Sequence, residues 1–142
     1  MSQVSIAPDV SALEIPMDAW TQPFWDATAN RKLLLPRCSN CHRFRWPPGP
    51  FCPYCQSQQT DWMPAGIARL YSFTLVADQG AKDAPEPRLR VPALIEFPEA
   101  DGVRLVAAVV NTPIEKIGIG AELTLGWSQA ANATVPVFSI PL

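Results

Sequence analysis

Cys38-Ser39-Asn40-Cys41 and, after a spacer of ten residues, Cys52-Pro53-Tyr54-Cys55 decide the fold of this chain. These two Cys-x-x-Cys turns contain all 4 cysteines of the 142-residue sequence. Each turn directs two sulfurs to one point, and two turns together complete the tetrahedron that Zn²⁺ accepts from four thiolates. The spacer is long enough for a short hairpin. We therefore predict a compact zinc ribbon whose ligands are Cys38, Cys41, Cys52 and Cys55.

The cysteines have other interpretations. They could form two disulfides or remain as four buried thiols. The sequence starts without the basic segment and apolar run of a secretory signal, so we expect a cytoplasmic protein. Disulfides are rare in that compartment, and this spacing there favours a metal. Iron in a rubredoxin-like electron carrier is the alternative metal. A four-thiolate zinc site has no open position for substrate, so we expect the zinc to be structural.

Composition narrows the remaining classes. The 16 prolines argue against long helices and favour strands, turns and extended arms. No apolar stretch approaches the roughly 20 residues that a membrane-spanning helix needs, so we expect no membrane contact. The net charge of −2 and the isoelectric point near 5.3 argue against a nucleic-acid partner, because such proteins are usually basic.

The N-terminal third is predicted to contain one short helix. Residues 1–17 have several apolar side chains but no clear period, and we expect either a flexible tail or an arm that orders on a partner. Residues 18–31 predict a helix with Pro23 in its first turn and Asn30 at its end. Trp20, Phe24 and Trp25 would lie on one side of this helix, either in the core or on a partner surface. Residues 32–36 predict a strand that enters the first turn.

Beyond Trp62 the sequence becomes rich in β-branched and aromatic residues. We expect a bend at Gly66, a turn at 99–102, a helical turn at 112–117 and a mobile polar loop at 78–90. Strands are predicted at 67–76, 92–97, 103–110, 121–127 and 135–140. Five short strands with a small helical insert between the third and fourth are typical of a Greek-key barrel of the OB type.

The predicted fold is thus mainly β. It comprises a flexible arm at 1–17, a helix plus four-cysteine zinc ribbon at 18–60 and a five-stranded OB-fold domain at 61–142.

A cluster of basic residues surrounds the first turn. Residues 31–60 contain no acidic side chain, whereas five of the 11 basic residues lie within 31–45. These cations would either offset the net charge of a tetrathiolate zinc site or bind the phosphate of a nucleotide-bearing ligand or nucleic acid. They are Arg31, Lys32, Arg37, Arg43 and Arg45. His42 is the only histidine, and we interpret it as a solvated loop residue.

The motifs around the cysteines follow an order that resembles a known family. They are Pro23-Phe24-Trp25, Leu33-Leu34-Leu35-Pro36-Arg37-Cys38, Cys41, Pro47-Pro48, Cys52-Pro53-Tyr54-Cys55, Trp62 and Gly66. Three later stretches, 91–96, 102–105 and 117–123, also fit. Over about 23–127 the chain therefore resembles the DUF35 family of acyl-CoA-associated proteins, which combine a helix, a rubredoxin-like zinc ribbon and an OB fold.

The resemblance implies an accessory subunit. Members of the family pair with thiolase-fold proteins (thiolases, acyltransferases and aldolases) or with MaoC-like hydratases, and the partner carries the chemistry. The implied role is to stabilise a hetero-oligomeric complex, with presentation of an acyl-CoA as a further role. Only the four cysteine ligands carry over residue by residue. The arm before Pro23 and the 78–90 loop have no counterpart, and no residue can be assigned to bind a cofactor.

The residues themselves argue against independent catalysis. A thiolase-like reaction needs a nucleophilic thiolate beside a base, but the metal uses all four cysteines and His42 stands alone. Gly-x-Ser-x-Gly, phosphate-loop and dinucleotide-binding motifs do not occur. We therefore predict no catalytic residues. The alternative function is a module for single-stranded nucleic acid, because OB folds and ribbons stack bases on aromatic side chains in basic grooves.

Overall fold

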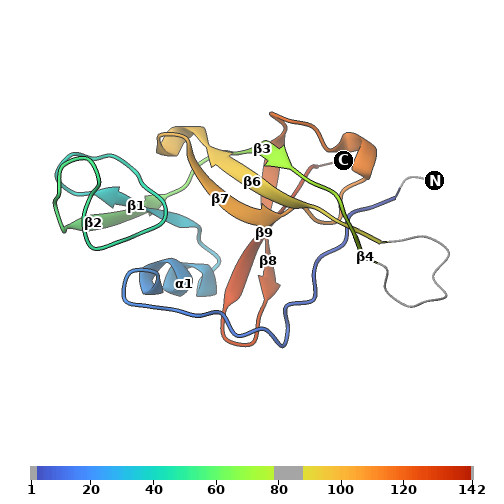
Figure 1. Ribbon diagram of the computed structural model, residues 1–142, viewed down its shortest axis with the longest axis horizontal. Coiled ribbons are helices and arrows are strands. Elements are labelled where there is room, and N and C mark those ends of the chain that lie inside the picture. Colours follow the sequence, from blue (N-terminus) through green and yellow to red (C-terminus); the bar gives the residue numbers. More distant parts are fainter. Residues whose placement is uncertain (1–2, 79–87, 142) are drawn as a thin grey trace.

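The computed structural model of this protein describes residues 3–78 and 88–141. In Figure 1 the two-stranded ribbon lies at the left and the five-stranded barrel lies in the middle, and helix α1 (Gln22–Ala29) lies below the region where they meet. No helix in the described ranges is long and apolar enough to cross a membrane. The predicted mainly β fold, with one short helix, a four-cysteine ribbon and a five-stranded barrel sheet, is confirmed.

The barrel is an antiparallel sheet in the order β7-β6-β3-β8-β9. Its sheet edges meet through a parallel bridge between Val109 and Phe138, where the Val110 N–H donates to the Phe138 carbonyl at 2.7 Å. The barrel is therefore nearly closed, which leaves little unpaired strand edge. Its strands are β3 (Ala68–Phe73), β6 (Pro92–Phe97), β7 (Val103–Ala108), β8 (Glu122–Gln129) and β9 (Thr134–Ser139).

Alternating side chains fill the barrel. In β6, Ala93, Ile95 and Phe97 are buried while the intervening residues are partly exposed, as expected for a strand with one face on the core. The ring of Phe97 lies 6.3 Å from that of Phe138 on β9. Two 3₁₀ turns complete the barrel, η1 (Pro98–Ala100) between β6 and β7 and η2 (Ile114–Lys116) before β8. The helical turn predicted at 112–117 is thus present.

The ribbon consists of β1 (Leu34–Cys38) and β2 (Thr60–Pro64), which pair antiparallel with Cys38 opposite Thr60. Two links join it to the barrel. The Phe44 N–H donates to Oδ2 of Asp101 at 2.9 Å, and Leu35 of β1 belongs to the same buried cluster as the barrel residues. Ribbon and barrel therefore share one continuous hydrophobic core.

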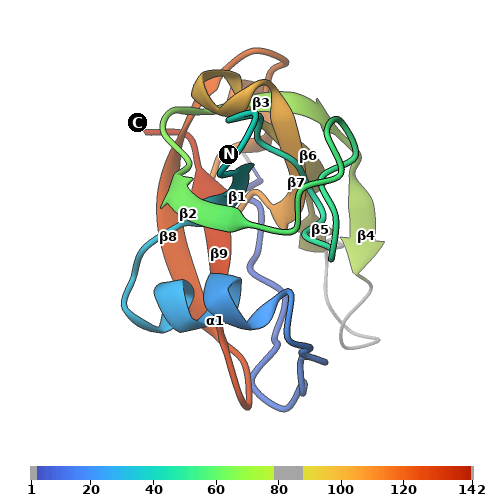
Figure 2. The ribbon, with the colours of Figure 1, turned by 90° about the vertical axis from the view of Figure 1, so that its left-hand side faces the viewer.

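Helix α1 (Gln22–Ala29) is shorter than the predicted 18–31 but has Pro23 in its first turn and Asn30 as its C-cap. The aromatic side chains in the helix and just before it lie in two environments. Phe24 is buried, with its ring 4.9 Å from the rings of both Trp25 and Trp46, whereas Trp20 is 48% exposed. The helix contacts β9 and β1 (Figure 2), so its buried face covers the junction between barrel and ribbon.

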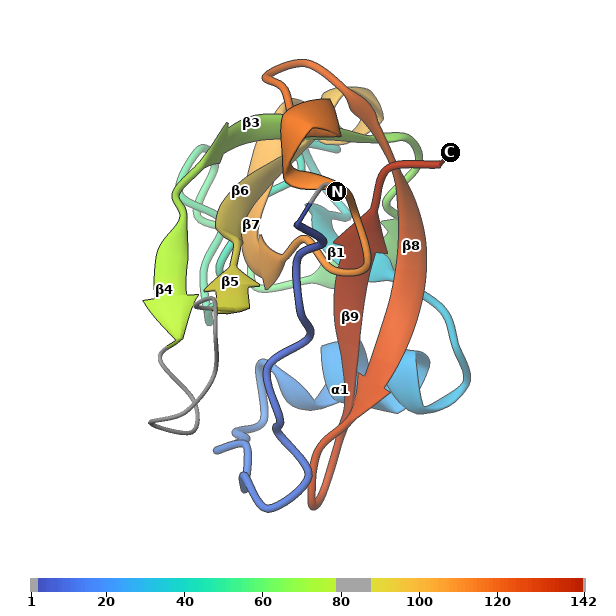
Figure 3. The ribbon, with the colours of Figure 1, turned by 90° about the vertical axis from the view of Figure 1, so that its right-hand side faces the viewer.

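The N-terminal arm lies along the barrel. Ser5 exchanges backbone hydrogen bonds with Thr112 and Asn111, and the amide side chain of Asn132 bonds both backbone groups of Ile15. In Figure 3 the arm runs beside β9 up to the loop that precedes β8. For this arm we expected either a flexible tail or ordering on a partner; over residues 3–17 it instead lies against its own barrel.

Two predictions around the long loop need correction. The strand expected at 67–76 is interrupted, because β3 ends at Phe73 and a separate strand, β4 (Val76–Asp78), follows. The polar loop expected at 78–90 begins and ends in strand, since β4 pairs with β5 (Arg88–Arg90). The two strands pair antiparallel, with Val76 opposite Arg90 and Asp78 opposite Arg88. The rest of this loop lies outside the described residues.

Gly66 has the left-handed backbone conformation (φ +80°) at the bend between β2 and β3. A Cβ at this position would lie 2.6 Å from Oε1 of Glu99, an oxygen that accepts the Ile67 N–H at 2.8 Å. The sequence therefore needs glycine here for two reasons, the positive φ and the close approach of Glu99.

We expect Gly66→Ala to lower the free energy of unfolding by about 1–2 kcal/mol, because an L residue resists this conformation and its methyl group displaces Glu99. Urea denaturation measures the change. Gly118→Ala is the matched control, since Gly118 has an ordinary φ and nothing lies within 4 Å of its added Cβ. Equal stability of the two variants would contradict this account of Gly66.

Candidate metal centre

The four cysteines converge at the tip of the ribbon. Cys38 ends β1, Cys41 follows in the same turn, and the second turn brings Cys52 and Cys55 back toward them. Their sulfurs all lie within 4.8 Å of one another, with 3.5 Å between Cys38 and Cys55 and 3.6 Å between Cys41 and Cys52. Disulfide sulfurs are about 2.05 Å apart, so these are free thiols.

The spacing of the sulfurs fits a four-coordinate metal. A tetrahedron with metal–sulfur bonds of about 2.3 Å has sulfur–sulfur edges of about 3.8 Å, within the observed range. Cys38 and Cys52 are buried, and Cys41 and Cys55 are half-buried. Four thiolates around one metal ion would leave no coordination position for a substrate.

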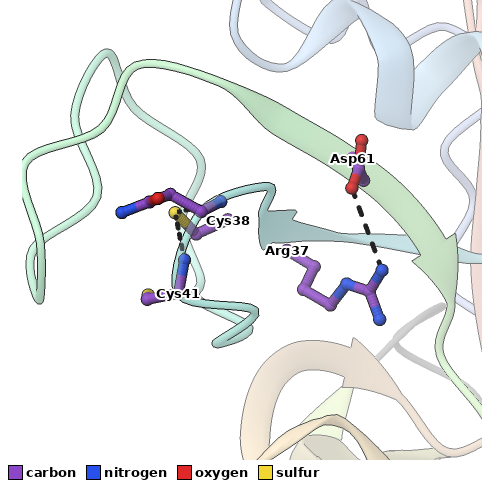
Figure 4. A network of polar contacts seen from close by, with 5 residues as sticks. Arg37, Cys38, Cys41 and Asp61 are labelled. Carbon is purple, nitrogen blue, oxygen red and sulfur yellow. Dashed lines mark hydrogen bonds and ion pairs between the residues drawn. The ribbon is translucent and has the colours of Figure 1, made fainter.

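Backbone N–H groups point at the sulfurs. In each Cys-x-x-Cys turn, the N–H groups that donate belong to residues two or three positions after the first cysteine. Cys38 Sγ accepts from the N–H groups of Asn40 and Cys41, each at 3.4 Å, and Figure 4 shows Cys41 directed at Cys38. In the second turn the Tyr54 N–H donates to Cys52 Sγ, also at 3.4 Å. The side-chain amide of Asn40 reaches across to Cys55 Sγ at 3.5 Å. These donors stabilise thiolates, the form that binds metal.

Two thiols are consequently easier to ionise. The N–H of Cys41 is the main cause that lowers the pKa of Cys38 to about 6, and it outweighs the opposing effect of burial. The amide of Asn40 is the main cause that lowers the pKa of Cys55. The pKa of Cys41 is instead raised to about 11, because the lowering effect of the Arg43 N–H is outweighed by burial and by the thiols of Cys52, Cys38 and Cys55. Cys38 and Cys55 therefore lose their protons more readily when a metal enters, whereas Cys41 loses its proton less readily.

The predicted basic cluster does not act as one patch. Arg37 of β1 pairs with Asp61 of β2 at 3.8 Å (Figure 4), and the guanidinium of Arg43 lies 4.5 Å from the centre of the Tyr54 ring. Arg45 is buried, whereas Arg31 and Lys32 are exposed. His42 is also exposed, with φ 65°, and is not part of the sulfur cluster.

Sequence reasoning missed two participants of this region. The role of Asn40 depends on how the second turn folds over the first, although its place inside Cys-x-x-Cys is a signal for an N–H···S bond. Nothing in the sequence indicated that Arg45 is buried. Its neighbours are basic and aromatic residues, which occur equally in exposed loops.

Comparison with known proteins supports a metal-binding ribbon. A family model described as the rubredoxin-like zinc ribbon domain of ChsH2 matches residues 25–61, the segment that holds all four cysteines. A protein of Thermomonospora curvata named probable enoyl-CoA hydratase alpha subunit is 36% identical over 119 residues. That match covers 81% of this chain but 36% of the relative, so the chain spans about a third of that curated protein.

Solved structures extend the likeness to the whole fold. A chain of the Ltp2-ChsH2(DUF35) aldolase matches with a TM-score of 0.75 and 32% identity, over 89% of this chain and 98% of that chain. A DUF35 protein of unknown function from Sulfolobus solfataricus matches with a TM-score of 0.62 and 18% identity, over 88% and 85%, which shows a common fold. With a relative this similar over almost its full length, the chain belongs to the DUF35 family.

Proposed function

We propose that this protein is a non-catalytic accessory subunit that associates with a thiolase-fold enzyme or a hydratase acting on acyl-CoA substrates. The observation that carries the proposal is the likeness to a chain of the Ltp2-ChsH2(DUF35) aldolase, of which this chain covers 98% at 32% identity. The name of the bacterial relative, a hydratase subunit, points to the same class of substrate. Since this chain matches about a third of that relative, hydratase activity is not transferred with the name.

The role of the metal in this proposal is structural. Four thiolates from Cys38, Cys41, Cys52 and Cys55 hold Zn²⁺, which supplies the free energy that the ribbon tip cannot obtain from a core of its own. We assign the chain to three segments with the predicted bounds: the arm at 1–17, the helix and ribbon at 18–60, and the barrel at 61–142. The barrel and ribbon provide a rigid shape for the partner, which carries out the reaction and to which the subunit helps present the acyl-CoA.

Nucleic-acid binding, the alternative function, has less support. The arginines that it requires are engaged elsewhere among the described residues: Arg37 with Asp61, Arg43 with Tyr54, and Arg104 with both Glu96 and Tyr71. The electron-carrier alternative requires iron, and a colourless zinc-loaded protein as isolated would exclude it.

The partner is tested by purifying the tagged chain from its native cells and identifying stoichiometric companions by mass spectrometry. We expect one thiolase-fold or hydratase subunit at comparable abundance, and the same pair should co-elute in size-exclusion chromatography when both are expressed together. A chain that stays monomeric beside each candidate enzyme would contradict the proposed function.

The ligand set is tested by substitution within the first turn. We expect Cys38→Ser to lose zinc and unfold the ribbon tip, because three thiolates leave the ion open to water. Metal analysis and thermal unfolding measure both effects, and partner binding should fall with them. Ser39→Ala lies between two of the ligands and serves as control, with metal content unchanged. Full zinc content in Cys38→Ser would show that the four-ligand assignment is wrong.

Asn40 tests the outer shell of the site. We expect Asn40→Ala to weaken zinc affinity about tenfold, since it removes the side-chain donor to Cys55 while the backbone donor to Cys38 stays. Competition with a zinc chelator measures the change. Gln59→Ala, at an exposed position, is the control. If Asn40→Ala leaves the zinc affinity unaltered, the side chain of Asn40 does not support the metal site.

A further inference from the structure

The guanidinium of Arg45 is buried without an anionic partner. The residue is 6% exposed, and its backbone is held beside β1 by the hydrogen bond from its N–H to the Pro36 carbonyl. Nη2 donates to Thr60 Oγ1 at 2.7 Å and to the Gly49 carbonyl at 3.3 Å. Nε and Nη1 are buried and have no hydrogen-bond partner. A buried cation with two unpaired donors is costly, which points to a missing anion.

Arg45 also lines a pocket of about 450 Å³ between the start of α1 and the ribbon. Among the described residues of this lining, Arg45 has the only charge. The lining also includes Trp20, which lies just before α1 and is 48% exposed, and Trp62 of β2. The pocket therefore combines one unneutralised cation with two large aromatic surfaces.

The sulfur cluster does not account for Arg45. The N–H···S donors of the site come from Asn40, Cys41 and Tyr54, whereas Arg45 donates to a hydroxyl and a carbonyl. Arg45 therefore contributes no hydrogen bond to the thiolates, and its remaining donors are available to another anion.

The chemistry of the pocket selects the class of ligand. The planar guanidinium matches the oxygens of a phosphate group, and a pocket of about 450 Å³ is much larger than phosphate alone. Tryptophan rings provide sequence-tolerant surfaces for a purine or pyrimidine base. We propose that this pocket binds the phosphate of a nucleotide, with Arg45 as the anion ligand and the two tryptophans as aromatic walls for the remainder.

Binding requires a small opening of the pocket, because the two unpaired nitrogens are covered in the ligand-free structure. Residues 47–50, which belong to no helix or strand and contribute Gly49 and two prolines to the lining, are the segment that we expect to shift. The nucleotide has two sources, a free nucleotide or the nucleotide half of a coenzyme A. The inference goes beyond the proposed function and concerns the isolated chain, so it does not depend on the partner.

Isothermal titration of the zinc-loaded full chain tests the site with adenosine 3′,5′-bisphosphate as probe and adenosine as control. We expect the bisphosphate to bind at least tenfold more tightly than adenosine, with an affinity that falls as salt is added. If AMP binds as tightly as the bisphosphate, the source is a free nucleotide. If the bisphosphate and coenzyme A both bind more tightly than AMP, the source is the nucleotide half of coenzyme A. The proposal would be overturned if the bisphosphate bound no more tightly than adenosine. It would also be overturned if a single-stranded oligonucleotide bound tenfold more tightly than the bisphosphate.

Two neighbouring glutamines provide matched variants. Both are exposed, but Gln58 lines the pocket and Gln59 does not. We expect Gln58→Glu to weaken bisphosphate binding at least fivefold, because the new carboxylate repels the phosphate and competes for Arg45. Gln59→Glu makes the same change in net charge outside the pocket and should leave the affinity within twofold of the unmodified chain. Equal effects of the two variants would overturn the location of the site.

Arg45→Lys tests the anion ligand directly. It keeps the charge but removes the planar fork, and we expect at least a tenfold loss of bisphosphate affinity with zinc content unchanged. Unaltered affinity in a folded Arg45→Lys chain would exclude Arg45 as the ligand. If this variant does not fold, the comparison of Gln58→Glu with Gln59→Glu still decides the proposal.

Discussion

Convergence of four sulfurs is the constraint on which the ribbon depends. Residues 39–59 contain no helix and no strand, so few backbone hydrogen bonds hold them, and they have only a few buried side chains of their own. Such a segment cannot compensate the entropy of ordering its chain by burying apolar surface. The turns direct N–H groups at the sulfurs, and these donors lower the pKa of Cys38 and Cys55, whereas the pKa of Cys41 is raised. Once the tip is closed, Cys38 ends β1 in a defined place and β2 can pair with it in register.

The ordered ribbon then becomes part of the barrel. Leu33 and Leu35 extend from the ribbon into the same core as Ile95 and Phe97, and Phe24 of α1 covers the junction. The hydrogen bond from Phe44 to Asp101 fixes the ribbon against the turn between β6 and β7. The ribbon, whose tip holds the four cysteines, is therefore joined to the barrel by shared packing and by this hydrogen bond. A rigid body of this kind suits a subunit whose contribution is its shape and surface rather than a reaction.

The chemically distinctive side chains of this chain lie in and around the ribbon. The four sulfurs converge at one point, His42 is exposed beside them, Arg37 pairs with Asp61, and Arg43 lies over the ring of Tyr54. Arg45 is buried against a pocket lined by two tryptophans, and two of its guanidinium nitrogens have no hydrogen-bond partner.

The four-cysteine ribbon and the positions of most barrel strands could be predicted from the sequence by itself. Cys-x-x-Cys spacing is a local property, and so are the runs of β-branched residues and the proline in the first turn of α1; these signals act over a few residues and can be read without the fold. The tertiary structure decided what depends on residues far apart. The arm lies on the barrel through hydrogen bonds of Ser5 and Asn132, and Trp20 is exposed whereas Phe24 is buried. The first barrel strand ends at Phe73, and Arg45 is buried. Each of these outcomes is set by packing and hydrogen bonding between segments that are distant in the sequence, and no local pattern encodes such contacts.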